Sequence, residues 1–222
     1  MAMTVHDVAA ALPGIAVLRE RCRALAMLEA IINREPESRR YSFDARWAPG
    51  TQLASMRNGG GDDWSIVFSP DGCFVRGFDH ESPMSPVQND DELWPGLVDT
   101  VPEVFADYVA EPAFSFDGTF KATVCLWRRH GDDRWHAGGP AFPDGDDPDG
   151  ADWLFQFLVD GTPAAYRCGA EAHYGTTLDL EAIGEVFAGR PLTGELVRRL
   201  DAGLPMTGLA GDLARIGYPS EP

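Results

Sequence analysis

Apolar residues recur at steps of three and four between residues 15 and 32, with charged side chains between them. These steps place side chains on one face of a helix, so the spacing predicts a half-buried helix. A shorter helix from about Val5 to Leu12 is expected before it, broken at Pro13 and Gly14. We predict that the two helices form an N-terminal arm over residues 5–33. The apolar positions of the longer helix are Ile15, Leu18, Cys22, Leu25, Leu28 and Ile32.

From Tyr41 onward the apolar period changes to two, which predicts a strand. One face of this strand is expected to carry Tyr41, Phe43, Ala45 and Trp47. Residues 64–78 predict a hairpin, because Pro70-Asp71-Gly72 suits a tight turn between two apolar runs. A second hairpin is expected from residues 120–128 paired with residues 134–137. Residues 41–138 therefore predict a sheet-rich, mainly antiparallel region.

Helical patterns return between and after these strands. Thr100-Val101-Pro102-Glu103 fits a capping box and predicts an inserted helix that ends before Pro112. The tail beyond Met206 is expected to be frayed. Helices, then a sheet with an inserted helix, then C-terminal helices over residues 151–203 predict a single α+β domain spanning residues 1–222. The C-terminal helices are expected over residues 151–161, 163–174, 179–188 and 193–200.

Acidic residues are concentrated in the middle of the chain. The 222-residue protein has 35 acidic and 18 basic residues and a formal net charge of −17. Residues 60–160 alone hold 21 acidic and 5 basic residues. A field of this sign repels nucleic acid and anionic membranes and attracts a basic protein. We expect no nucleic-acid or membrane partner, and the alternative to a basic protein partner is a negative surface that only maintains solubility.

Cysteine usage and the N-terminal residues favour a cytoplasmic protein. Cys22, Cys73, Cys125 and Cys168 form no Cys-x-x-Cys pair, so we expect reduced core residues and not zinc ligands or nucleophiles. The N-terminal residues lack the basic start and apolar block of a secretory signal. No apolar stretch approaches the roughly 18 residues of a membrane helix.

Asp79, His80 and Glu81 follow an apolar run, at a strand exit where functional loops often lie. Adjacent strand residues face opposite ways, so a metal site at His80 would need distant partners. One hypothesis is therefore a metal-assisted hydrolase that uses His80, Glu81 and a distant histidine. We favour an acidic turn whose carboxylates accept backbone N–H bonds. The distant partners in the hydrolase hypothesis would come from His130, His136 or Glu111.

Other motif-like stretches match no known site. Residues 144–152 offer several carboxylates, but Pro148, Asp149 and Phe155 occupy the fifth, sixth and twelfth positions of a calcium loop and exclude an EF-hand. The glycines within residues 56–64 lack the Lys-Ser/Thr pair of a phosphate-binding loop and precede a strand. No nucleophile elbow, His-Glu-x-x-His pair or dinucleotide fingerprint occurs. We predict no catalytic residue, no metal site and no cofactor.

Trp94 is a large aromatic residue two positions after the acidic run of residues 90–92. Tryptophan is enriched among the residues that dominate binding energy at protein interfaces. This pattern predicts a protein-binding edge, with packing of Trp94 at the end of a core as the alternative. The predicted partner-binding residues are Asp79, Glu81, Asp91, Glu92 and Trp94.

Several sequence blocks taken together resemble a family of uncharacterised bacterial cytosolic proteins that share these blocks in this order. The blocks include SMRNGGGDDW, GFDHESPMSP, WPG, EPAF and CLWRRHGDDRW, and the resemblance covers roughly residues 5–200. It implies no activity or site residues. A looser similarity, in size class, acidity and α+β type, is to immunity proteins of bacterial toxin systems. The leading hypothesis is thus a non-enzymatic protein-binding domain, with the hydrolase and a structural homo-oligomer as alternatives.

Overall fold

A computed structural model describes residues 3–221 of the chain. The helices are α1 (Val5–Ala11), α2 (Ile15–Ile32), α3 (Ala106–Val109), α4 (Ala151–Asp160), α5 (Pro163–Tyr174), α6 (Leu180–Phe187), α7 (Gly194–Leu200) and α8 (Ala210–Ile216). The strands are β1 (Tyr41–Ala48), β2 (Thr51–Arg57), β3 (Asp63–Ser69), β4 (Gly72–Phe78), β5 (Ser115–Phe116), β6 (Thr119–Phe120), β7 (Val124–Arg129) and β8 (His136–Ala137). This composition confirms the α+β prediction.

Six strands form one antiparallel sheet in the order β1-β2-β3-β4-β7-β8. The predicted hairpin is β3–β4, and its register pairs Ser69 with Gly72. Gly72 has a φ of 148°. A Cβ atom at Gly72 would lie 2.2 Å from the carbonyl oxygen of Arg128 in β7, so only glycine lets the neighbouring strand approach.

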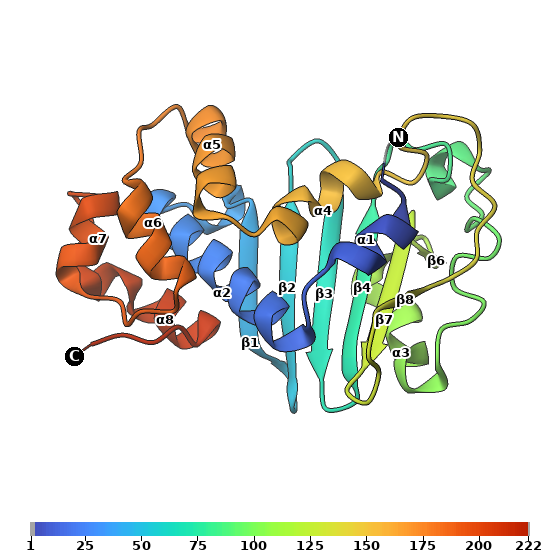
Figure 1. Cartoon of the computed structure of the whole chain (residues 1–222), viewed down its shortest axis with the longest axis horizontal. Coiled ribbons are helices and arrows are strands. Elements are labelled where there is room, and N and C mark those ends of the chain that lie inside the picture. Colours follow the sequence, from blue (N-terminus) through green and yellow to red (C-terminus); the bar gives the residue numbers. More distant parts are fainter. Residues whose placement is uncertain (1–2, 222) are drawn as a thin grey trace.

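Helices α1, α2 and α4 cover one face of the sheet (Figure 1). The apolar stripe of α2 is buried against this face, and Leu18 and Leu28 are fully enclosed. The two helices predicted as an N-terminal arm pack on the sheet and are part of the main core. Burial of the stripe explains their position, because leaving it in water would forfeit roughly 1.5–3 kcal/mol for each large apolar side chain.

The opposite face of the sheet is covered by the segment between β4 and β7. Phe74 of β4 packs there against Phe105, with ring centroids 6.2 Å apart. Trp47 also lies on this side and stacks on Phe114, whereas Phe43 faces the other core. The prediction that Trp47 and Phe43 share a face is wrong, because the β1–β2 register shifts between Asp44 and Ala48. Such a bulge reverses the side to which later residues point.

The inserted helix is shorter than the capping pattern predicted. A 3₁₀ turn over Glu103–Phe105 leads directly into the single helical turn α3. No hydrogen bond from Thr100 caps it within residues 3–221. The capping box occurs instead at Thr4 and Asp7, at the start of α1.

The four C-terminal helices α5–α8 gather beyond β1, at the end of the molecule opposite β8 (Figure 1). The buried Glu29 of α2 links α5 to the core by accepting hydrogen bonds from the hydroxyls of Tyr166 (3.0 Å) and Tyr174 (2.5 Å). The prediction of a frayed tail beyond Met206 is wrong: it forms a 3₁₀ turn and α8, and buries Ile216 and Tyr218.

The structure also bears on the predictions about the cysteines and about membrane helices. Cys22, Cys73 and Cys125 are buried, as expected of small core residues, but Cys168 on α5 is exposed. Within residues 3–221 no helix has the length and apolar character needed to cross a bilayer.

Candidate functional site

Two loops lie against each other at the β8 end of the sheet, and they contain all five predicted partner-binding residues. We call residues 79–99 and 138–149 together the acidic loop pair. The Trp94 indole donates to the carbonyl of Ala141 (2.9 Å), and the backbone N–H of Gly139 donates to that of Gly96 (3.0 Å). The Ser82 hydroxyl donates to the carbonyl of Pro148 (2.6 Å). These bonds make one surface from segments far apart in sequence.

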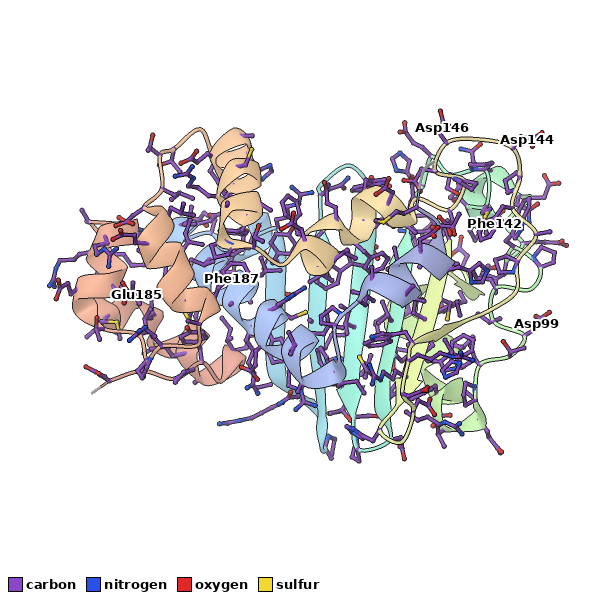
Figure 2. The ribbon with its side chains drawn as sticks, in the orientation of Figure 1. Asp99, Phe142, Asp144, Asp146, Glu185 and Phe187 are labelled. Atoms are coloured by element: carbon purple, nitrogen blue, oxygen red, sulfur yellow. The ribbon has the colours of Figure 1, made fainter. Side chains whose placement is uncertain are left out.

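The acidic loop pair contains ten acidic residues and no lysine or arginine. Figure 2 shows Asp99, Asp144 and Asp146 extending from this end of the molecule, opposite Glu185. Within residues 3–221 none of the exposed acids of the pair forms an ion pair, so their charge is not neutralised by a bound side chain. The exposed acidic residues of the pair are Glu81, Asp90, Asp91, Glu92, Asp99, Asp144 and Asp146.

Two adjacent aspartates in the first loop have unusual backbone conformations. Asp90 and Asp91 have φ values of 52° and 61°, in the left-handed region that non-glycine residues rarely adopt. The turn is closed by the backbone N–H of Asp91, which donates to the carbonyl of Pro86 (2.9 Å). The neighbouring side chain of Val87 is 61% exposed. The loop thus presents an apolar side chain beside three acids, in a turn whose left-handed backbone aspartate adopts more readily than most residues.

His80 is paired with Asp62, which comes from the loop between β2 and β3. One carboxylate oxygen of Asp62 lies 2.6 Å from His80 Nδ1 and also accepts the His80 backbone N–H at 2.8 Å. The amide of Asn58 donates to the other oxygen of Asp62 at 2.5 Å. The hydrogen bond with Asp62 raises the pKa of His80 above its usual value. Burial of Asp62 favours the neutral acid, but the hydrogen bonds from His80 and Asn58 outweigh it and lower the pKa of Asp62.

Asp79 lies close to this pair, and one ligand atom from each of Asp62, Asp79 and His80 falls within 4.8 Å of the others. No other such group of possible metal ligands occurs in residues 3–221. However, the Asp79 carboxylate is already occupied. One oxygen accepts the backbone N–H of Glu81 (2.9 Å) and the other accepts the Trp153 indole (3.0 Å). Asp79 therefore has the local role in a turn that the sequence favoured.

The distant residues proposed for a metal site do not meet His80. His130 lies beside Ser69, with Nε2 3.2 Å from its carbonyl oxygen, and Ser69 is at the opposite end of β3 from Asp63. A seven-residue strand separates the two ends by roughly 20 Å. His136 contacts Asp132 instead, with Nε2 3.6 Å from a carboxylate oxygen. Glu111 caps the following turn by accepting the backbone N–H of Ala113 (3.1 Å).

Two acids of the second loop, Asp147 and Asp149, are less exposed than those at its tip. Asp149 is fully buried, and its two oxygens accept the backbone N–H groups of Val5 (2.8 Å) and Ala151 (3.1 Å). Burial raises the pKa of Asp149 to about 6. Burial also raises the pKa of Asp147. The loop therefore contains two kinds of acid: Asp149 holds the backbone together from inside, whereas the acids at the tip are exposed to solvent.

Asp62 is the site residue that sequence reasoning missed. It follows the glycines of residues 59–61, and the sequence showed only a loop that leads into a strand. Asp62 and His80 are 18 positions apart and meet because β3 and β4 pair as a hairpin that places Asp63 opposite Phe78. Only the register of this hairpin could have signalled their contact.

Comparison of the chain with models of protein families, with curated proteins and with solved structures gave no match.

Proposed function

We propose that the protein binds a basic protein partner through the acidic loop pair. The observation that carries the proposal is a surface of seven exposed acids without a lysine or arginine, assembled from two loops that hydrogen bonds hold together. Such a surface attracts a positively charged partner over a distance of about one Debye length, near 8 Å at physiological salt. A basic toxin neutralised by an immunity protein is one partner of this chemistry.

The loop pair also offers contacts beyond charge. Val87 is exposed next to the acidic turn, and Trp94 is half-buried with its N–H already bonded inside the loop pair. Binding energy at interfaces commonly comes from a few apolar or aromatic residues, while surrounding charges set association rate and specificity. We assign the anchoring contact to Val87 and the steering to Asp90, Asp91 and Glu92.

The proposal is tested by neutralising the turn acids in the variant Asp90→Asn/Asp91→Asn/Glu92→Gln. Asparagine tolerates the left-handed backbone of Asp90 and Asp91, so the loop should keep its shape. Immobilised protein is incubated with lysate of the source organism at about 50 mM and about 500 mM salt, since screening weakens steering between exposed charges. We expect a basic protein that the natural chain retains at low salt and releases at high salt. The variant should fail to retain it.

The matched control is Glu35→Gln/Glu37→Gln/Glu195→Gln, which removes the same charge from exposed acids outside the loop pair. It should retain the same protein as the natural chain. If the two triple variants retain the same proteins, the surface has no specific role and the proposal fails.

A metal-assisted hydrolase is the second candidate, favoured by the grouping of Asp62, Asp79 and His80. A divalent cation there would have to replace the hydrogen bond between His80 and Asp62 and those accepted by Asp79. Three nearby protein ligands are the usual number in a catalytic zinc site. This candidate therefore predicts that a metal changes the environment of His80.

A further inference from the structure

A second site lies at the other end of the strands, where the β1–β2 and β3–β4 turns meet the start of α2. It is a cleft of about 770 Å³, within the range of roughly 300–1,000 Å³ typical of small-molecule sites. Its polar lining includes Arg19, Arg46, Gln52 and His130. None of the described residues that line it is acidic. Acidic residues outnumber basic ones nearly two to one in this chain, so a cleft with two arginines and no carboxylate departs from the rest of the molecule.

Among the described residues, the two arginines have no acidic partner. Within residues 3–221 neither Arg19 nor Arg46 forms an ion pair, although the nearby Asp44 is paired with Arg215 (3.5 Å). The guanidinium carbon of Arg19 lies instead 5.3 Å from the centre of the Phe68 ring. This contact fixes the direction of the side chain without neutralising its charge.

Polar atoms in the cleft lack partners. Arg19 Nε and Gln52 Oε1 are buried, and no hydrogen bond satisfies either atom within the described chain. The Nε atoms of Arg23, Arg40 and Arg76 elsewhere in the described chain are likewise unpaired, so these two atoms show only that the lining has hydrogen-bonding capacity the fold does not use. The amide of Gln52 can present its N–H₂ group after rotation, since its oxygen and nitrogen are interchangeable in position.

His130 contributes a further polar group. Its Nε2 faces the carbonyl of Ser69, which can only accept, so Nε2 carries the proton, and Nδ1 has no hydrogen bond to any residue from 3 to 221. Trp47 lines the same cleft with a half-buried ring that is held by stacking on Phe114. The lining thus combines two arginine guanidinium groups with an aromatic ring.

We propose that this cleft binds a small anionic molecule whose phosphate or carboxylate group lies between Arg19 and Arg46 and whose planar or apolar part contacts Trp47. A guanidinium group can donate two parallel hydrogen bonds to the oxygens of a phosphate or carboxylate. Arg19 and Arg46 are free to do so, because neither forms an ion pair within residues 3–221. The site is independent of the acidic loop pair, because the length of β3 separates them by roughly 20 Å.

The proposal is tested by calorimetric titration of the full chain with three probes: pyrophosphate, citrate and adenosine monophosphate. Pyrophosphate and citrate distinguish a phosphate site from a carboxylate site, and the nucleotide adds a planar ring. We expect saturable binding of at least one probe. Arg46→Gln should weaken it by about tenfold or more, because a charge-assisted contact is lost.

Arg19→Met is the second variant, since methionine keeps an apolar stem over Phe68 while removing the charge. It should weaken binding to a similar extent. The control Arg198→Gln removes one charge from the exposed surface of α7 and should leave affinity within about twofold, as expected of a distant surface charge. The proposal is overturned if no probe binds at about 10 mM, far above the micromolar to millimolar range of ordinary ligands. It is equally overturned if both cleft variants bind as the natural chain does.

Discussion

The acidic loop pair and the arginine cleft lie at opposite ends of the same strands and have opposite charge. The loop pair places seven exposed carboxylates together without a basic residue, and the cleft places two arginines together without an acidic one. A protein of net charge −17 that paired its charges wherever possible would place acids around Arg19 and Arg46. The comparison shows that total charge does not describe local chemistry. Each end instead has the sign that suits a different partner.

The two regions also differ in how they are held. The cleft is formed by strand ends and short turns, so its position follows from the sheet. The loop pair contains little regular structure and depends on a few hydrogen bonds and close backbone contacts, including that between Gly139 and Gly96. Changes at these contacts should therefore affect the acidic surface without affecting the cleft.

The largest loss in the free energy of unfolding is expected from Gly138→Ala. A Cβ atom there would lie 2.3 Å from the carbonyl oxygen of Gly96 and 2.4 Å from that of Leu97. Both obstacles are backbone atoms of the first loop, so the two loops must separate. We expect a loss of at least about 2 kcal/mol in the free energy of unfolding, the scale of an overpacked contact. Denaturant titration measures it, and binding of the basic partner should fall with it.

The adjacent Gly139→Ala is the matched control. Nothing lies within 4 Å of a Cβ atom at Gly139, and its φ is not positive. We expect a change of less than about 0.5 kcal/mol, as for an ordinary surface substitution. Equal destabilisation by the two substitutions would show that the loops are not in close contact.

The sheet and the long helices were predictable because their signals are local. The spacing of apolar residues identifies α2 without knowledge of the rest of the chain. The apolar runs on either side of Pro70-Asp71-Gly72 identify the β3–β4 hairpin in the same way. β2 was missed, because its apolar residues Leu53, Ala54 and Met56 do not alternate regularly with polar ones. The predicted side of Trp47 was wrong, since a bulge has no signal in apolar spacing.

The candidate sites were less predictable than the fold. The acidic turn was visible in sequence, but the second loop that completes it is joined only through contacts such as that of Trp94 with Ala141. The arginine cleft had no signal, because it combines residues as distant in sequence as Arg19 and His130. Helix α8 was missed for a similar reason: seven residues are too few for a stable helix alone, and burial of Ile216 supplies what propensity lacks.

A smaller effect on the free energy of unfolding is expected when the pH is changed, through Asp149 at the base of the loop pair. Burial raises the pKa of Asp149 from 3.8 to about 6 in the folded protein. The folded state therefore binds its proton more tightly, and this contribution is present below pH 4 and lost as pH rises through 6. Lowering the pH from 7 to 5 should stabilise the protein by about 1 kcal/mol through this group.

Other acids oppose this trend. The pKa values of Asp7 and Asp201 are lowered by hydrogen bonds from Thr4 and Arg34, so their contributions are lost at low pH. The measurement is therefore the difference between the natural chain and Asp149→Asn in denaturant titrations at pH 7 and pH 5. The natural chain should gain stability relative to the variant as the pH falls. A constant difference would mean that Asp149 titrates normally.

The smallest effect on the free energy of unfolding is expected from the His80–Asp62 pair, and it can be followed at a single residue. The hydrogen bond with Asp62 raises the pKa of His80 above 6.5, so its contribution to stability is complete below pH 6.5 and is lost as pH rises through the folded value. Asp62→Asn removes the charge of the partner and should return the pKa of His80 toward 6.5. Nuclear magnetic resonance titration of the imidazole measures it, and an unchanged midpoint in Asp62→Asn would contradict the pairing.

The same imidazole signal separates the two proposed functions. In the hydrolase, one equivalent of Zn²⁺ should shift the His80 resonance saturably, and Asp79→Asn should abolish that shift because one of three ligands is lost. In a protein-binding domain the carboxylates are satisfied by N–H groups and the imidazole by Asp62, so Zn²⁺ should leave His80 unchanged. His173 in α5 serves as the internal reference, since its ring contacts Tyr174 far along the chain from this site. An unchanged His80 signal would assign its hydrogen bonds to holding the acidic loop pair in place, and would leave the exposed carboxylates of that pair to recognise the proposed partner.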